Sequence, residues 1–177
     1  MIELRTLDET DAVAFRAIWL RALREHPEAF GAAWEEEQQT AEEIATRLRT
    51  EATPESFTLG AFAGQTLVGI VSFRRWTQVK LRHSSSLSGM YVAPEVRGQG
   101  VGRMLIAEVV ARARRLPGVQ RIRLAVTATN VTARALYESL GFESFGIEPQ
   151  QLLVDGQGYD VDWMVLSLHP AGQHEEE

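Results

Sequence analysis

Three glycines within five positions, Gly98, Gly100 and Gly102, separate the apolar run that ends in YVAP from a stretch with helical periodicity. Glycine leaves the backbone N–H groups of such a loop uncovered by side chains, and the start of a helix adds the positive end of the helix dipole. Loops of this kind usually hold an anion. Arg97 and Arg103 flank the loop, which supports the same interpretation. The feature predicts a strand, an anion-binding loop and a helix in succession.

The distribution of charge indicates what kind of anion to expect. The formal net charge of −6 argues against a general nucleic-acid-binding protein. The segment from Arg97 to Arg134 nevertheless contains eight arginines and one acid, Glu108, and is therefore +7. Some of these arginines could simply form a solvated helix face. Because the glycine loop begins this basic stretch, the expected ligand is polyanionic.

Two common phosphate-binding loops do not fit. A P-loop needs Lys and then Ser or Thr after its last glycine, but Gly102 is followed by Arg103 and Met104. A dinucleotide-binding loop needs a third glycine, where this chain has Arg103, and an acid about 20 residues later. The expected strand 121–127 contains no acid.

Apolar periodicity predicts the order β-α-α-β-β-β-α-β-α-β-β, an α/β (α+β) domain with a mixed sheet and helices on its faces. The expected strands are 2–7, a hairpin within 57–75 that turns at Gly64-Gln65, 87–93, 121–127, 142–147 and a pair around Asp155-Gly156. The expected helices are 11–25, 40–48 with Thr40 and Glu43 as a capping box, one closed by Pro117-Gly118 and one that follows Asn130. Residues 82–86 are interpreted as a polar loop.

We expect one domain over residues 1–170, followed by an acidic, disordered tail at 171–177. The chain has no cysteine, so it can form neither a disulfide nor a thiolate zinc site. The first residues lack the apolar segment of a secretory signal, and no apolar run approaches the ~20 residues of a membrane span. We therefore expect a cytoplasmic protein without a metal and without membrane or nucleic-acid partners.

A third loop pattern, Arg/Gln-x-x-Gly-x-Gly/Ala, is matched by Arg97, Gly100 and Gly102 directly after MYVAP. Here the chain resembles the GCN5-related N-acetyltransferase (GNAT) superfamily, and the resemblance covers most of its length. The segment NVTARALYESLGF, residues 130–142, is similar to the downstream family segment in which Asn, Leu-Tyr and Gly-Phe recur in this order. The resemblance implies a mostly antiparallel sheet whose fourth and fifth strands splay apart at a bulge. It also implies acetyl transfer from acetyl-CoA to a primary amine, either of a small molecule or of a peptide or protein.

The resemblance also implies roles for particular residues. Backbone groups of Met90, Tyr91 and Val92 would pair with pantetheine in the gap between the splayed strands. The coenzyme's pyrophosphate would lie against the loop formed by Arg97, Gly98, Gln99, Gly100, Val101, Gly102 and Arg103. Asn130 would contact the pantetheine arm, although a helix N-cap would equally explain an Asn there. Tyr137 would protonate the departing thiolate. The alternative for Tyr137 is a packed aromatic residue whose hydroxyl bonds to backbone.

The base that deprotonates the amine stays unassigned in the sequence. Strand four has Ser88 where some relatives place an acid, which puts a base at that position in doubt. The remaining candidates are Glu35, Glu36, Glu37, His83, Glu148 and Asp160. Without cysteine, an acetyl-cysteine intermediate is impossible, so we expect direct attack in a ternary complex.

The resemblance also implies where the acceptor binds: between the first two helices, residues 26–39, and at the last hairpin, near 148–162. Both regions are acid-rich and contain an aromatic residue, Trp34 and Tyr159, which would suit a cationic amine. Alternatively, Trp34 belongs to the core and the acids serve solubility. A non-catalytic acetyl-CoA-binding sensor or interaction module stays open as a second function, and a homodimer through the C-terminal strand is possible.

Overall fold

The computed structural model describes residues 1–168, so the prediction for the tail at 171–177 lies outside the described residues. The strands are β1 (Ile2–Thr6), β2 (Ser56–Ala63), β3 (Thr66–Arg75), β4 (Ser84–Val92), β5 (Arg121–Thr127), β6 (Glu143–Val154) and β7 (Gln157–Ser167). The helices are α1 (Ala12–Glu25), α2 (Ala41–Glu51), α3 (Val101–Ala113) and α4 (Val131–Ser139). Short 3₁₀ turns are η1 (Glu9–Asp11), η2 (Pro27–Ala29), η3 (Trp34–Glu36) and η4 (Pro94–Val96). This order of helices and strands confirms the predicted one.

The strands form one sheet in the order β1-β2-β3-β4-β5-β7-β6. β4 and β5 run parallel and every other neighbouring pair is antiparallel, which confirms the mixed, mostly antiparallel sheet. β4 pairs with β5 only where Ser84–Ser86 face Arg121–Arg123. Beyond these residues the two strands diverge, so the predicted splay between the fourth and fifth strands is also confirmed.

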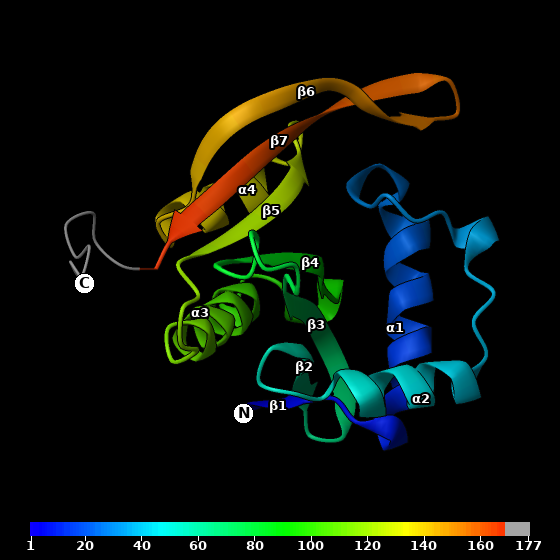
Figure 1. The fold of residues 1–177 in the computed structure, drawn as a ribbon. Coiled ribbons are helices and arrows are strands. Elements are labelled where there is room, and N and C mark those ends of the chain that lie inside the picture. The colour runs from blue at the N-terminus through cyan, green and yellow to red at the C-terminus, as the bar shows by residue number, and fades with distance from the viewer. Residues whose placement is uncertain (169–177) are drawn as a thin grey trace.

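Helices cover both faces of the sheet, with α1 and α2 on one side of β2–β4 and α3 on the other (Figure 1). Successive residues of β3 face opposite sides of the sheet, and their neighbours show the same arrangement of helices. A Cβ at Gly69 would lie 3.1 Å from Leu105 of α3. The adjacent Ile70 shares a cavity with Phe15 of α1, on the opposite face.

The buried core follows the predicted apolar stripes. In α3 the stripe of Val101, Leu105, Val109 and Ala113 is fully buried. Thr40 and Glu43 form the predicted capping box at the start of α2. None of the helices within residues 1–168 is both long and apolar enough to cross a membrane.

Some predicted boundaries were wrong. Residues Ser84–Ser86 belong to β4, although the run of serines was interpreted as a loop. Neighbouring strands on both sides satisfy the backbone there, and the Ser85 hydroxyl donates to the Arg121 carbonyl at 2.9 Å. The strand expected at 142–147 continues as β6 to Val154, with register shifts along its pairing with β7. β6 therefore forms the sheet edge, and the C-terminal strand β7 is paired on both sides.

Candidate active site

A bulge in β4 lies where the strand separates from β5. Ser88 pairs with Ser72 of β3, and the next paired residue of β4 is Tyr91, opposite Ile70. β4 thus uses one more residue than β3 over this interval, and Gly89 within it has a φ of +60°. A bulge bends its strand and redirects the backbone groups that follow. It therefore turns the end of β4 away from β5.

The backbone after the bulge faces the gap. The Ala93 N–H donates to the Val68 carbonyl of β3 at 2.8 Å. Because successive backbone groups of a strand point to opposite edges, the N–H and C=O of Val92 point away from β3. The Val92 carbonyl accepts the Arg97 Nε at 3.0 Å on that side, which agrees with this direction.

The glycine loop presents a row of free amide donors. Gly98 and Gly100 have φ values of +75° and +79°, which glycine adopts without steric cost, and Gly100 is the N-cap of α3. Within residues 1–168, none of the backbone N–H groups from Gly98 to Arg103 donates a hydrogen bond. Uncapped N–H groups at a helix N-terminus bind phosphate or carboxylate oxygens. The predicted anion-binding loop therefore has the geometry of an anion cradle.

The residues around this cradle hold it in place. The Arg97 Nη2 lies 3.0 Å from the His26 Nε2, and the Arg103 Nη2 donates to the Ser139 Oγ of α4 at 2.7 Å. A Cβ at Gly102 would come within 3.1 Å of Leu136, so only glycine permits this approach of α3 to α4 without displacement. Gln99 turns its side chain back toward the Glu95 carbonyl, at 3.4 Å.

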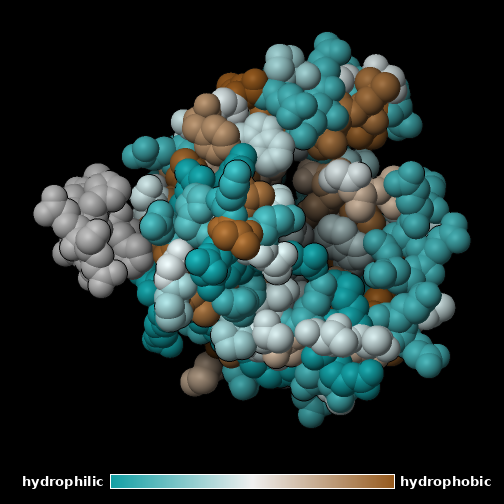
Figure 2. All heavy atoms as spheres, viewed as in Figure 1, coloured by the Kyte–Doolittle hydropathy of each residue, from teal (hydrophilic) through white to brown (hydrophobic). Residues whose placement is uncertain are grey.

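A cleft of about 740 Å³, which we call the main cleft, runs from the glycine loop along the gap between β4 and β5. Figure 2 shows the surface hollowed below the β6–β7 hairpin, beside α1. With the exception of Gln99, all of the proposed coenzyme-binding residues line the main cleft: Met90, Tyr91, Val92, Arg97, Gly98, Gly100, Val101, Gly102, Arg103, Asn130 and Tyr137.

Tyr137 is buried on the inner face of α4, with its ring edge-on to Phe142 at 5.7 Å between centroids. Burial raises the pKa of the Tyr137 hydroxyl above its ordinary range, so the hydroxyl keeps its proton at neutral pH. In the described part of the chain this hydroxyl has no hydrogen-bond partner, and burial is the sole cause of its pKa shift. A protonated hydroxyl on the wall of a cleft can donate its proton to a ligand.

Asn130 is the N-cap of α4, since its Oδ1 accepts the Ala133 N–H at 3.2 Å. The helix N-cap that the sequence offered as an alternative explanation for Asn130 is therefore present. Its side chain also lines the main cleft, so the amide nitrogen can serve a ligand while the oxygen caps the helix.

A second cavity of about 460 Å³, which we call the side cavity, lies on the α1 side of the sheet. It shares Ala29 and Phe30 with the main cleft, and it includes Gly89, the residue directly before Met90. The two cavities therefore meet at the β4 bulge. The remaining lining residues of the side cavity are Phe15, Trp19, Gly31, Ala32, Glu37, Gln39, Arg47, Ile70, Ser72, Leu87, Ser88 and Ala125.

Of the six candidate bases, only Glu37 lines either cavity. Its Oε2 accepts the indole N–H of Trp19 at 3.0 Å. Glu35 and Glu36 are exposed in η3. The other three are engaged elsewhere: His83 lies 2.9 Å from an Arg121 nitrogen, Glu148 accepts the Trp163 indole N–H, and Asp160 accepts the Gln150 N–H.

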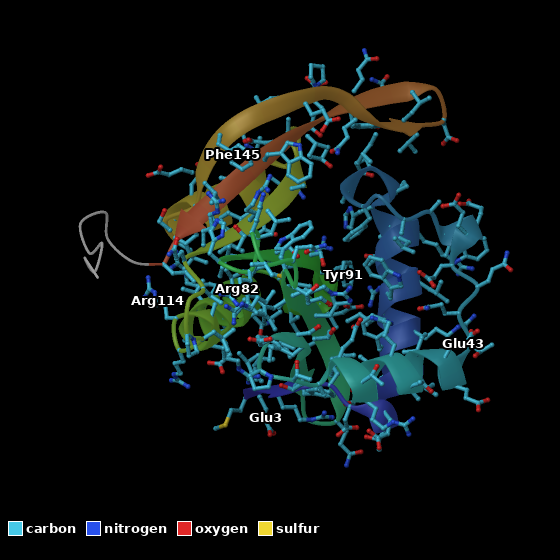
Figure 3. The ribbon with its side chains drawn as sticks, in the orientation of Figure 1. Glu3, Glu43, Arg82, Tyr91, Arg114 and Phe145 are labelled. Carbon is cyan, nitrogen blue, oxygen red and sulfur yellow. The ribbon has the colours of Figure 1, made fainter. Side chains whose placement is uncertain are left out.

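Several residues near the site were missed by sequence reasoning. His26 and Glu28 line the main cleft, and the Thr127 hydroxyl fixes their segment to β5 by donating to the Glu28 carbonyl at 2.6 Å. For Tyr91, which was predicted for its backbone groups, the side-chain contact was missed: it lies between β4 and α1 (Figure 3), where its hydroxyl donates to Glu25 at 2.6 Å. No local pattern marks these residues, because each contact joins distant parts of the chain.

Of the two regions that the sequence predicts for acceptor binding, only the one between α1 and α2 lines a cavity. The segment 29–39 does line the side cavity, but neither cavity includes a residue of β6 or β7. Trp34 and Tyr159 line neither cavity. Trp34 is instead 37% exposed, with the Arg24 guanidinium 4.1 Å above its ring.

Comparison with known proteins identifies the family to which the chain belongs. Residues 19–142 match the sequence profile of the acetyltransferase (GNAT) family, and the chain therefore belongs to that family. It is 33% identical over 150 residues to mycothiol acetyltransferase of Brachybacterium faecium, a match that covers 84% of this chain and 43% of that protein. The chain spans less than half the length of the mycothiol acetyltransferases that it matches first.

Solved structures agree with this assignment. A ribosomal-protein-alanine N-acetyltransferase from Brucella melitensis is 30% identical, with a TM-score of 0.79 over 93% of this chain and 99% of that chain. A putative acetyltransferase from Salmonella typhimurium, solved with its cofactor acetyl-CoA, shares the fold at 23% identity, with a TM-score of 0.82 over 97% of this chain and 96% of that one.

Proposed function

We propose that the protein transfers the acetyl group of acetyl-CoA directly to a primary amine within a ternary complex. The observation that supports this most strongly is the row of free amide donors from Gly98 to Arg103 at one end of the main cleft. A diphosphate held there would direct the thioester arm along the gap toward the β4 bulge, where the side cavity begins. The structure related in fold was solved with this same coenzyme.

The residues of the main cleft have the chemistry that the transfer needs. The amine nitrogen attacks the thioester carbonyl, a bond from nitrogen to carbon forms, and the carbon–sulfur bond breaks. The backbone N–H of Val92, directed into the gap, and that of Met90 beside it would stabilise the developing oxyanion, an effect worth roughly 3–4 kcal/mol in a dry site. Tyr137 would donate its proton to the departing thiolate.

The incoming amine must lose a proton, because an ordinary amine is an ammonium ion at pH 7. We propose Glu37 for this role, as the candidate base that lines the side cavity. Its hydrogen bond from Trp19 fixes one carboxylate oxygen and leaves the other available. The side cavity also argues for catalysis over coenzyme binding alone, since a sensor would need no second cavity beside the reactive end of the coenzyme.

The experiment that tests the function measures thiol release from acetyl-CoA across a panel of primary amines, with the acetylated product identified by mass spectrometry. Release that depends on an added amine supports the proposal. Coenzyme binding by calorimetry with no release on any amine would favour the non-catalytic module. Mixing acetyl-CoA with the enzyme alone should leave no acetylated protein, because the proposed transfer is direct. The cytoplasm, where acetyl-CoA is available, is the location that accompanies this proposal.

A further inference from the structure

The side cavity contains a charge that the transfer reaction itself does not explain. Among its lining residues are one cationic side chain, Arg47 of α2, and one carboxylate, Glu37. An amine acceptor alone would need the carboxylate and would be repelled by a guanidinium. The presence of both indicates that the acceptor has an anionic group as well as an amine.

The hydrogen-bonding capacity of Arg47 is largely unused. Within the described residues its Nε is sealed from solvent without an acceptor. Its ion-pair partner, Glu51, lies 3.6 Å from Nη1 and also pairs with Arg74. A ligand cannot reach the sealed Nε, but the terminal nitrogens make no hydrogen bond within residues 1–168 and can bind an anion in the side cavity.

The guanidinium of Arg47 is nevertheless held in one place. It lies over the ring of Phe15, 5.0 Å from the centroid, and its side chain is only 29% exposed. A guanidinium offers parallel N–H groups that match the two oxygens of a carboxylate. The partly desolvated position strengthens that attraction compared with a fully exposed arginine.

Within residues 1–168, Glu37 and Arg47 form no ion pair with each other: Glu37 accepts the Trp19 indole N–H, and the ion-pair partner of Arg47 is Glu51. The two opposite charges on the cavity wall thus remain separate. The same cavity is also lined by apolar side chains and by a glycine of the bulge: Phe15, Trp19, Phe30, Leu87 and Gly89. The lining suits a small molecule with an apolar body and two charged ends.

We propose, building on the acetyltransferase function above, that the acceptor is a small amino acid, whose carboxylate binds Arg47 while its amino group lies at the β4 bulge. The volume of about 460 Å³ is within the range of small-molecule sites. The apolar walls favour an amino acid with a medium-sized apolar side chain over a polyamine, which would place a second cation near Arg47. Arg47 is in this view a specificity-determining residue, and the acetylated product is an N-acetylamino acid.

Matched substrate pairs test this on the unaltered enzyme. Leucine is compared with 3-methylbutylamine, which lacks the carboxylate, and with leucinamide, which replaces the carboxylate by a neutral group. Each kcat/KM is corrected for the fraction of free amine. We expect leucine to be preferred over both by about 10- to 100-fold, the usual range for a hydrogen-bonded charge.

The variant Arg47→Gln should reduce that preference to within a few-fold of unity, and Arg47→Lys should restore part of it. Arg49→Gln is the matched control, because Arg49 is an exposed arginine on the same helix. If the enzyme acetylates 3-methylbutylamine or a peptide N-terminus as well as it does leucine, the inference fails and the acetyltransferase function stands. If no amine of the panel releases thiol, the proposed function itself fails.

Discussion

Replacing Tyr137 by Phe separates catalysis from folding, because it removes one oxygen atom and leaves the buried ring. The hydroxyl makes no hydrogen bond within residues 1–168, so its loss breaks no contact in the fold. Removing a hydroxyl that has no hydrogen-bond partner in the fold leaves no other polar group unsatisfied, so the effect on stability is small. We therefore expect the free energy of unfolding to change by less than about 0.5 kcal/mol.

The expected effect on turnover is much larger. Loss of a general acid typically slows a reaction by ~10²–10⁴-fold, which corresponds to about 2.7–5.4 kcal/mol in the activation free energy. Acetyl-CoA affinity should change little, because the edge-on contact of the ring with Phe142 is retained in the Phe variant. A large loss of turnover with almost unchanged stability would therefore indicate that the hydroxyl acts in catalysis and not in folding.

The assay combines steady-state thiol release at saturating acetyl-CoA, calorimetric titration with acetyl-CoA and urea unfolding. Tyr159→Phe is the control, since Tyr159 lines neither cavity. Wild-type turnover in the Tyr137→Phe variant would refute the assignment of the general acid. A large loss of stability would instead show that the hydroxyl supports the fold.

Three further predictions concern the loop, the base and acid stability. Gly100→Ala and Gly64→Ala both place a side chain at positive φ in open space, so each should cost about 1–2 kcal/mol of stability. Only Gly100→Ala should weaken acetyl-CoA binding in calorimetry. Equal binding by both variants would contradict the proposed anion cradle. Glu37→Gln should lower kcat/KM at pH 7 by about 10²-fold or more and regain activity as pH approaches the pKa of the amine, and an unchanged pH–rate profile would exclude Glu37 as base. The pKa of Asp11 is lowered, mainly by the hydrogen bonds from Arg5, so this pair stabilises the fold above pH ~4 and the stability is lost as pH falls through the lowered folded pKa. Asp11→Asn should therefore destabilise the protein by about 2 kcal/mol at pH 7 in urea unfolding and by less at pH 3, whereas an equal loss at both values would mean that ionisation is irrelevant.

Local sequence patterns were sufficient to predict the helices and strands and the anion-binding loop. The apolar stripe of α3, the Thr40 capping box and the turn at Gly64 each depend on residues close together in the chain, so sequence spacing reveals them. The loop from Gly98 to Arg103 is likewise local, since a helix start creates free N–H groups wherever it occurs. By contrast, the serines at 84–86 form a strand only because β3 and β5 flank them.

The acceptor side of the site could not be derived in this way. The sequence offered Glu37 as one of six candidate bases, and only the fold shows that it lines the side cavity. No sequence pattern pointed to Arg47, which lines the same cavity. Both lie on segments that reach the sheet only through the packing of α1 and α2. Their positions depend on contacts between residues far apart in sequence, for which periodicity contains no information.

The sequence by itself thus determined the class of fold, the order of its elements and the loop at the start of α3, because helix and strand periods and the freedom of glycine are properties of the local chain. Only the tertiary structure decided which residues of β4 form the bulge, that a second cavity opens there, and that Glu37 and Arg47 share it. Packing brings these distant residues together, and the choice of acceptor depends on that assembly.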